Sequence, residues 1–239
     1  MISWQIGCSG FQYRHWKHIF YPDKLAQKNW FHYYSTHFTT VELNVTFYRF
    51  PDIKMVTAWY EKSAPGFVFT VKAPRIITHY KKLIDTESLV AEFYDTLRTG
   101  FKEKLGCVLF QFPPSYSYSE ERLDKVIAAM DVSFNNVIEF RHNSWWADDV
   151  YKKLVENHIT FCGMSHPLLP ADIIHNNSVL YYRMHGVPHL YKSPYVHTEL
   201  EKIVSTISKI RMLKIAYIYF NNDIDGSAVR NAKEMLGLT

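Results

Sequence analysis

The sequence predicts an α/β fold: a single (β/α)₈ TIM-like barrel that spans residues 1–239 and has a degenerate sixth crossover. Short apolar runs alternate with amphipathic segments, a pattern typical of parallel βαβ units. Eight such units fit into 239 residues, and barrels of this kind usually have roughly 250. An open doubly wound sheet is the alternative, but Gly7-Cys8-Ser9-Gly10 after the first run lacks the G-x-G-x-x-G fingerprint of that fold.

The apolar runs are short and bounded by polar residues, as buried parallel strands are. The expected strands are Gln5–Cys8, Thr40–Asn44, Phe67–Lys72, Val108–Phe112, Val137–Phe140, Thr160–Gly163, Val179–His185 and Ile215–Phe220. Several of these runs end in charged or amide side chains. Because barrel active sites lie at the carboxyl ends of the strands, these ends mark the expected site.

Helical patterns separate most of the strands. The expected helices are Lys24–Ser35, Ile53–Ser63, Ser88–Lys104, Glu120–Met130, Asp148–Asn157, Thr198–Met212 and Ser227–Leu236. Ser117 lies three residues before Glu120 and predicts a capping box at the start of that helix. Residues 165–170, Ser-His-Pro-Leu-Leu-Pro, cannot begin a regular helix, so the sixth crossover is expected to be a loop with at most a short helix.

Composition places the chain among single globular domains. Apolar residues make up 47% and charged residues 21%, and no Gly/Ser/Pro-rich linker divides the chain. No apolar stretch approaches the roughly 20 residues that span a bilayer, and residues 1–5 lack a signal-peptide pattern. We therefore expect a cytoplasmic protein with no membrane partner. Cys8, Cys107 and Cys162 are an odd number and fall in separate strands, which argues against a disulfide framework.

The charge pattern gives weak support to a nucleic-acid partner. The net charge is +4, and the basic residues are spread along the chain rather than clustered. Nucleic acid is thus a possible but not a favoured partner, and the oligomeric state is open. We expect no cofactor.

Motifs run through the whole chain and are jointly specific. They are Gly7–Phe11, Phe20–Pro22, Val41–Tyr48, Val71–His79, Val108–Pro114, Glu139–Trp145, Tyr182–Gly186 and Tyr219–Asn222. Together they resemble the YecE-like family, known as domain of unknown function 72. The resemblance implies a TIM-like barrel and brings no established activity. Two positions depart from the family pattern: Cys8 stands where Thr is usual, and Ser165-His166-Pro167 replaces a more typical Asp-x-Pro.

Glu42 and Glu139 are the first catalytic candidates. In Val41–Thr46 the polar and aliphatic residues alternate, so a strand would put Glu42 and Asn44 on one face. Two carboxylates in a partly dry barrel mouth can take different pKa values, one acting as an acid and the other as a base. The alternative is that each carboxylate is neutralised by a neighbouring cation.

Cations end or follow the same strands. They are Lys72, Arg75, Arg141 and Arg183. Arginine presents a fixed fork that suits carboxylate or phosphate, so these residues could clamp an anionic substrate. Alternatively, Arg141 pairs with Glu139 and Lys72 pairs with Glu42. A Schiff base at Lys72 is a further alternative, because desolvation lowers the pKa of lysine, although adjacent carboxylates oppose that shift.

Histidines follow three of the strands and raise the question of a metal. His79, His142 and His185 could ligate a divalent ion together with Glu42 and Glu139. The chain has no H-x-H or H-E-x-x-H spacing, and the surrounding Lys and Arg would repel a dication. We therefore expect no metal ligands, and hydrogen bonding by neutral histidine instead.

Uncharged polar and aromatic residues complete the expected site. The amides are Asn44, Gln111, Asn221 and Asn222, and the aromatic residues are Tyr13, Trp16, Tyr21, Tyr48, Trp145 and Trp146. Amides orient hydroxyls or a base edge, or else satisfy loop backbone. The aromatic side chains either stack on a flat sugar or base, or plug the mouth against one another. Gly226-Ser227 opens the last expected helix, whose amides could hold a phosphate.

These patterns favour an enzyme that uses general acid/base chemistry on a small polar anionic substrate, such as a sugar or nucleotide phosphate. The expected catalytic residues are Glu42, Glu139, Lys72 and His185. The expected substrate-binding residues are Asn44, Tyr13, Tyr48, Gln111, Arg141, His142, Arg183, Asn221 and Asn222. A metal-dependent phosphoesterase or nuclease and a non-enzymatic ligand-binding protein are the alternatives. Hydrolysis, elimination and isomerisation all stay open.

Overall fold

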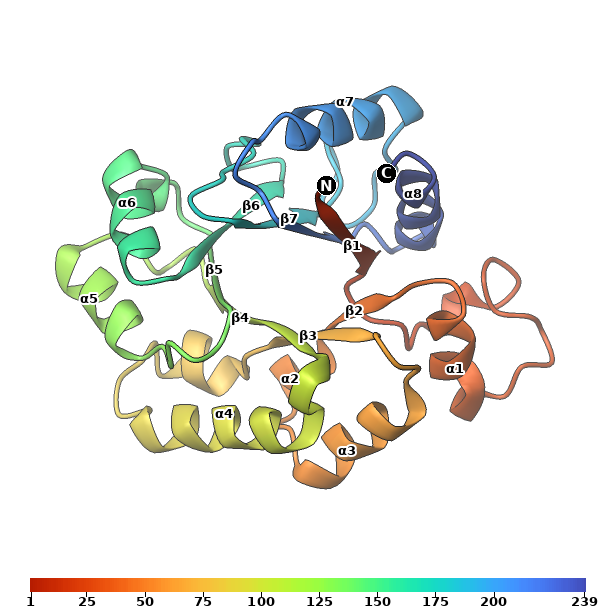
Figure 1. Cartoon of the computed structure of the whole chain (residues 1–239), viewed down its shortest axis with the longest axis horizontal. Helices are drawn as coiled ribbons and strands as arrows, with labels where there is room; N and C mark the ends of the chain where they lie inside the picture. The colour runs from red at the N-terminus through yellow and green to blue at the C-terminus, as the bar shows by residue number, and fades with distance from the viewer.

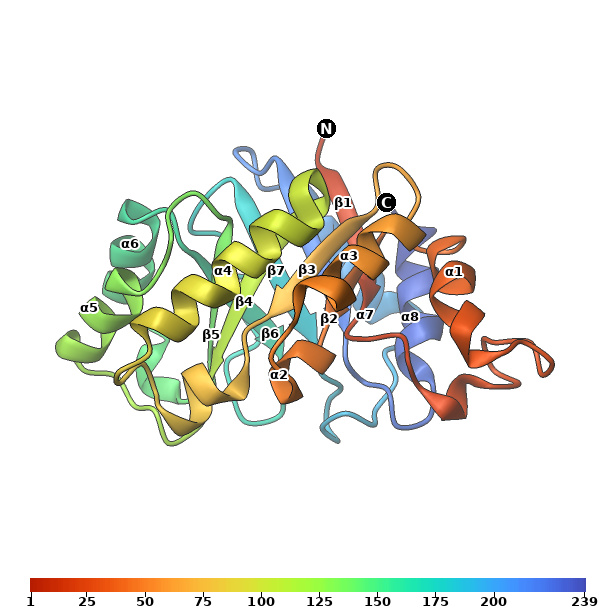
Figure 2. The same ribbon diagram turned by 90° about the horizontal axis from the view of Figure 1, so that it is seen from below.

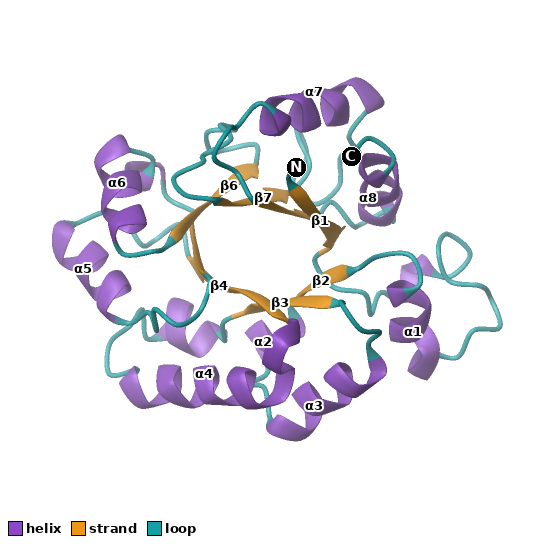
Figure 3. Cartoon of the chain, viewed as in Figure 1, coloured by secondary structure: helices purple, strands orange, loops and turns teal.

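The computed structural model describes residues 1–239, and its eight strands form one parallel sheet that curls into a barrel surrounded by helices (Figures 1 and 3). The strands are β1 Ser3–Cys8, β2 Thr40–Leu43, β3 Val68–Lys72, β4 Leu105–Phe112, β5 Asn136–Phe140, β6 Thr160–Ser165, β7 Val179–Met184 and β8 Ile215–Phe220. From β2 to β8 each strand pairs in parallel with the next strand along the chain, and β8 pairs with β1. The barrel predicted from the sequence is confirmed.

The barrel closes between β1 and β2 without a regular ladder. An isolated parallel bridge joins Ser9 to Glu42. Deeper in this seam, the hydroxyl of Tyr34 accepts from the backbone N–H of Cys8 at 2.9 Å and donates to the carbonyl of Thr40 at 2.9 Å. A helix side chain therefore supplies hydrogen bonds that a ladder would otherwise make, and the seam ends directly at a candidate site residue.

Eight α-helices lie outside or above the strands. They are α1 Trp30–Ser35, α2 Val45–Tyr48, α3 Ile53–Lys62, α4 Glu87–Phe101, α5 Glu120–Ala128, α6 Asp148–Glu156, α7 His197–Ser208 and α8 Ser227–Leu236. Short 3₁₀ turns cover Arg14–Trp16, Gln27–Asn29, Lys102–Lys104 and Asn143–Trp145, and a π turn covers Ile76–Tyr80. No helix lies between β6 and β7, as expected for the sixth crossover.

Two local expectations are corrected at helix starts. α5 is capped by Ser119, whose Oγ accepts from the N–H of Arg122 at 3.2 Å, and not by Ser117. Ser117 instead accepts from the Arg122 guanidinium at 2.8 Å. The second expected strand also ends early, because Asn44 has helical backbone angles and caps α2. Asn44 therefore does not share a strand face with Glu42.

Apolar residues fill two spaces. A large core lies between the sheet and the helices, and a smaller cluster lies within the barrel. The inner cluster comprises Cys107, Leu109, Val137, Cys162, Tyr181, Tyr217 and Tyr219. Side chains alternate along a strand, so the next inward positions lie at the carboxyl ends and carry the polar residues. In Figure 2 the N-terminus lies at the upper edge, and α2 marks the carboxyl ends at the lower edge.

All three cysteines are free and buried, so the structure has no disulfide. No helix combines the length and the apolar character that crossing a membrane requires.

Candidate functional site

Arg183 lies at the centre of a hydrogen-bonded network at the carboxyl ends of the strands. From β7 it donates to Glu42 on β2, with Nε at 2.9 Å and Nη2 at 2.6 Å. Its Nη1 donates to Glu139 on β5 at 2.6 Å. One guanidinium thus bridges two carboxylates from strands on different sides of the barrel. We call the connected side chains the Arg183 network: Ser9, Glu42, Gln111, Glu139, Arg141, Tyr181, Arg183, His185 and Asn221.

Both oxygens of Glu42 are fully engaged. Ser9 Oγ donates to one oxygen at 2.6 Å, and the Tyr181 hydroxyl donates to the other at 2.5 Å. Arg183 donates to both oxygens. Glu42 is fully buried, so these donors replace the water that a carboxylate needs. Lys72 is not its partner, which corrects the expected alternative pairing.

Glu139 is held in a similar way. Gln111 donates to it at 2.7 Å, and Arg141 Nε and Arg183 Nη1 also donate. Burial acts to raise the pKa of Glu139, but the guanidiniums of Arg141 and Arg183 overcome this and hold the pKa well below its ordinary value. Glu139 is therefore ionised at neutral pH, and the expected pairing of Glu139 with Arg141 is present.

His185 is a neutral acceptor at the edge of the network. Burial, together with the charges of Arg141 and Arg183, lowers its pKa well below the ordinary value. Arg141 Nη2 lies 2.9 Å from His185 Nε2, and a guanidinium can only donate. Nε2 is therefore the accepting nitrogen, and the other ring nitrogen, Nδ1, lies 3.2 Å from the side-chain amide nitrogen of Asn221. Strand ends β5, β7 and β8 are linked in this way.

Lys72 lies beside the network but makes no hydrogen bond or ion pair with it. Its Nζ is 4.1 Å from the centroid of the Phe47 ring, and the residue is 7% exposed. The two carboxylates are already matched by two guanidiniums, Arg141 and Arg183. Burial and the charge of Arg183 lower the pKa of Lys72 to about 7. At neutral pH much of this amine is therefore uncharged.

His79 lies in the π turn that follows β3, and Arg75 directly precedes that turn. The His79 ring packs edge-to-face on the Phe47 ring, with 4.8 Å between the ring centroids, and its Nδ1 lies 2.9 Å from Thr78 Oγ1. Burial and the charge of Lys72 lower the pKa of His79 to about 4, so His79 is neutral. Arg75 makes no ion pair and lies between two tyrosine rings.

Three expected binding residues meet at a small cavity next to the seam. Tyr13, Asn44 and Tyr48 line it, and its volume is about 220 Å³. The Tyr13 hydroxyl donates to the carbonyl of Ser9 at 2.5 Å, and Asn44 Nδ2 donates to the same carbonyl at 3.3 Å. Asn44 Oδ1 is buried and has no partner. These residues are assembled beside the network rather than within it.

Several expected contacts are not available in this geometry. All the N–H groups of Arg183 face network acceptors, and the residue is fully buried, so it offers no donor to a ligand. His142 accepts from the Ser144 backbone at 3.2 Å, outside the network. Asn222 is buried, and its amide holds the carbonyl of Ser193 at 3.1 Å and the side chain of Asn231 at 3.0 Å.

The expected phosphate-binding position at the N-terminus of α8 is not accessible to a ligand either. Gly226 and the first residues of α8 are buried, and the Ile19 side chain covers Gly226. Trp16, Tyr21 and Trp145 are all buried, which agrees with the alternative that the aromatic side chains pack against one another. Tyr48, in contrast, is 68% exposed.

Sequence reasoning missed three members of the site. Ser9 follows β1 within the motif Gly7–Phe11, and Tyr181 shares strand parity with Arg183, so both could have been found. His166 follows β6, with its ring 5.9 Å from that of His185. Burial and the charge of Arg141 lower the pKa of His166 to about 4. No sequence spacing pointed to His166.

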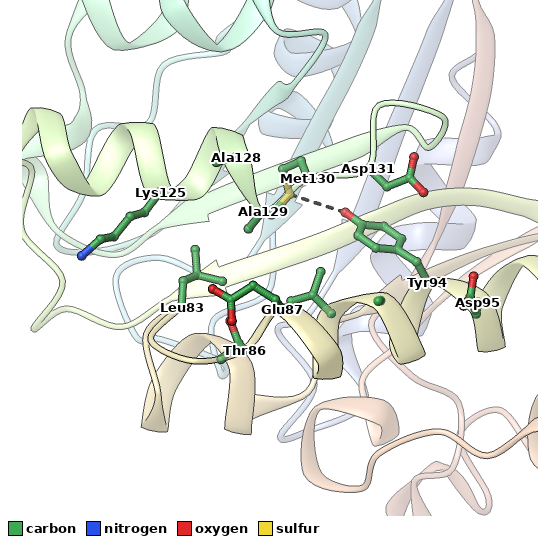
Figure 4. A pocket seen from close by; sticks show the side chains of 12 residues that line it. Leu83, Thr86, Glu87, Tyr94, Asp95, Lys125, Ala128, Ala129, Met130 and Asp131 are labelled. Atoms are coloured by element: carbon green, nitrogen blue, oxygen red, sulfur yellow. Dashed lines mark hydrogen bonds between the residues drawn. The ribbon is translucent and has the colours of Figure 1, made fainter.

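The structure assembles no group of three His, Cys, Asp or Glu side chains that could hold a metal ion. A further cavity of about 500 Å³ lies between α4 and α5 on the outer wall (Figure 4). It is lined by residues such as Leu83, Tyr94 and Met130 and contains no member of the Arg183 network. We place the candidate site at the network because the ionisable groups converge there.

Comparisons with known proteins agree along the whole chain. The family model described as "Protein of unknown function DUF72" matches residues 5–239. UPF0759 protein YunF of Bacillus subtilis (strain 168) is 26% identical over 256 residues, which cover 91% of this chain and 89% of that protein. A solved DUF72 family protein of Thermotoga maritima MSB8 is 28% identical with a TM-score of 0.90, covering 99% of this chain and 98% of the other.

A DUF72 family protein of Enterococcus faecalis V583 has a TM-score of 0.83 at 19% identity, covering 100% of this chain and 95% of the other. At that identity the likeness concerns the fold alone.

Proposed function

The chain belongs to the DUF72 family of proteins of unknown function, and from the geometry of its barrel mouth we propose that it is an enzyme acting on a small polar anionic substrate. One observation carries the proposal. Two buried carboxylates are matched by two guanidiniums, and Lys72 is left over without a partner. Burying an amine without a partner costs stability, so the fold alone gives no reason to keep it.

The geometry favours Lys72 over the two carboxylates as the group that exchanges protons. The oxygens of Glu42 and Glu139 are occupied by protein donors, and the guanidiniums of Arg141 and Arg183 hold the pKa of Glu139 well below its ordinary value, so Glu139 is a weak base. An amine with a pKa of about 7 can both take up and release a proton at neutral pH. In this proposal the carboxylates fix the arginines in place.

Arg75 and Arg141 are the cations best placed for the anion. Arg75 has no carboxylate partner, and its guanidinium is 5.5 Å from the Tyr48 ring centroid and 5.2 Å from that of Tyr80. Arg141 uses Nε and Nη2 within the network, which leaves Nη1 free. A guanidinium fork can then bind carboxylate or phosphate oxygens.

A turnover experiment tests the enzymatic part. Wild type, Lys72→Met and the control Lys54→Met, whose lysine is exposed on α3, are incubated with a panel of sugar phosphates, nucleotides and small carboxylic acids. Mass spectrometry follows substrate loss. We expect at least one compound to be consumed by wild type and Lys54→Met, and about 10²-fold more slowly by Lys72→Met. Equal rates in all three proteins would contradict the assignment.

A binding experiment tests the anion part separately. Inorganic phosphate should raise the melting temperature of wild type above that in chloride of matched ionic strength, because a ligand at a hundredfold excess over Kd adds about 2.7 kcal/mol. Arg75→Ala should lose the shift. Arg98→Ala, which removes an exposed arginine paired with Asp131, should keep it. An equal shift in Arg75→Ala would mean that phosphate acts elsewhere.

The two alternative functions make different demands. A metal-dependent phosphoesterase would need a ligand group that these residues do not assemble, so no observation favours it. A non-enzymatic ligand-binding protein would show the phosphate shift without any turnover.

A further inference from the structure

We propose that Lys72 forms a covalent imine with an aldehyde or ketone that also carries an anionic group. This deepens the proposed function, on which it rests, by naming the carbonyl as the reacting group. The geometry behind it is the position of Nζ, which packs on the Phe47 ring at the end of β3 and meets no oxygen acceptor. An amine with no acceptor keeps its lone pair available once its proton has left.

A second buried lysine shows that this state is not a general result of burial. Lys104 is 8% exposed and also lies over an aromatic ring, 4.5 Å from the Tyr60 centroid. Its ammonium donates to the carbonyls of Tyr60 and Ser63, both at 2.9 Å, and to Ser63 Oγ at 2.7 Å. Three protein oxygens therefore accept hydrogen bonds from the Lys104 side chain. Lys72 has similar burial and no such oxygens.

Charged and titratable groups surround Lys72 from four sides. Arg183 on β7 and Arg141 after β5 oppose its charge, while Glu139 and Glu42 favour it. His79, from the turn after β3, is neutral. Burial and Arg183 are the largest influences, and together they lower the pKa of Lys72 to about 7. About half of the amine is then neutral at pH 7, against roughly one in 10³ for an ordinary lysine.

The reaction balances without an added oxidant or reductant. The nitrogen lone pair attacks the carbonyl carbon, the π pair moves to oxygen, and a proton passes from nitrogen to oxygen to give a carbinolamine. One further proton then allows the hydroxyl to leave as water and leaves a protonated imine. That cation carries the same charge as the lysine ammonium, so Glu139 and Glu42 favour it and burial and Arg183 oppose it, as they do for the ammonium.

His79 is the group best placed to move these protons. Its Nδ1 is engaged with Thr78, and its ring and Lys72 Nζ both contact the Phe47 ring. This leaves Nε2 of a neutral imidazole as a proton acceptor and donor. The anionic part of the substrate would reach Arg75 or Arg141, the two cations with free donors. The proposed substrate carries the carbonyl and the anion in one small molecule.

Reductive trapping tests the inference. Wild type is incubated with dihydroxyacetone phosphate, or with dihydroxyacetone as the matched neutral probe, and sodium cyanoborohydride. Peptide mass spectrometry then measures each lysine. The expected adduct adds the mass of the probe less one oxygen to Lys72. Its yield at pH 7 should exceed that at exposed Lys54 and at buried Lys104 by about tenfold or more, because the lowered pKa of Lys72 leaves much of that amine neutral.

The phosphate probe should also label Lys72 about tenfold more than dihydroxyacetone does, and Arg75→Ala should reduce that preference. Labelling of Lys72 no greater than that of Lys54 would overturn the imine. If phosphate still raised the melting temperature of wild type but not of Arg75→Ala, the anion site would stand and only the imine would be lost. If phosphate also gave no such shift, the proposed anionic substrate would fall as well.

Discussion

Each end of the barrel buries one lysine, and the two lysines differ in whether protein oxygens accept hydrogen bonds from the side-chain amine. Lys104 lies just before β4, at the amino end, where three protein oxygens accept its protons. Lys72 ends β3, at the carboxyl end, where the nearest acidic groups are already paired with arginines. Both residues are more than nine-tenths buried over an aromatic ring. The supply of acceptors, rather than burial, therefore distinguishes Lys104 from Lys72, the lysine that we propose to be reactive.

The contrast depends on how the carboxyl end distributes its charges. Arg183 points from β7 into the barrel, where its guanidinium reaches Glu42 on β2 and Glu139 on β5. If either carboxylate were released, it could accept from Lys72 and raise the pKa of that amine. The Arg183 network thus keeps the lysine unpaired, and changes to either partner test the comparison.

The largest expected effect comes from removing Arg183. Arg183→Met leaves Glu42 and Glu139 buried without the cation that bridges them, and breaking a buried pair from one side costs about 3–5 kcal/mol. Urea unfolding at pH 7 measures the loss. The control Arg98→Met removes an exposed pair with Asp131 and should cost less than about 1 kcal/mol. Similar losses in the two variants would show that the buried network stabilises the fold no more than an exposed ion pair does.

The next effect is a pH dependence that belongs to Lys72. Its pKa is about 7 in the folded protein and near 10.4 in the unfolded chain, so between these values the unfolded state binds more protons. Wild-type stability then rises with pH by up to about 1.4 kcal/mol per unit. Lys72→Met lacks this term.

Urea unfolding of both proteins at pH 7, 8 and 9 isolates the Lys72 contribution, because the other titrating groups cancel in the difference. Wild type should gain about 2–3 kcal/mol relative to Lys72→Met across that range. Parallel curves would mean that the Lys72 ammonium keeps its proton in the folded state, as an ordinary lysine does.

A smaller effect is expected at the other lysine. Lys104→Met removes three hydrogen bonds and leaves the carbonyls of Tyr60 and Ser63 without their donor, which should cost about 2 kcal/mol at pH 7. Lys54→Met, on the exposed face of α3, should change stability by less than about 0.5 kcal/mol. A Lys104→Met protein as stable as wild type would remove the contrast on which the comparison rests.

Strand pattern and parity were enough to predict the barrel and the convergence of the site. The final strand and helix, Ile215–Phe220 and Ser227–Leu236, match the sequence prediction at both ends. Glu139 and Arg183 reach one end because parallel strands share a direction and inward side chains alternate. These properties are local, so a single sequence contains them.

Pairing across the barrel could not be predicted in the same way. Lys72 and Arg183 are both cations near strand ends, and the sequence does not say which one lies opposite Glu42. That choice depends on barrel diameter and on the longer reach and fork of arginine, which satisfies both carboxylates at once. The early end of β2 at Leu43 was equally hidden, because Asn44 turns the chain into α2 with no distinctive signal.

The smallest expected effect concerns two thiols, one at each end of the barrel, which should be equally unreactive towards a thiol reagent. Cys8 ends β1 at the carboxyl end, and Cys107 lies near the start of β4 at the amino end. Burial raises the pKa of both thiols, so neither supplies the reactive thiolate. Ellman's reagent should leave both unmodified in the native protein and react with all three cysteines after denaturation. Rapid modification of Cys8 with Cys107 protected would show that the whole carboxyl end is open to reagents. The special behaviour of Lys72 would then follow from access rather than from missing acceptors, and the comparison of the two lysines would need a different cause.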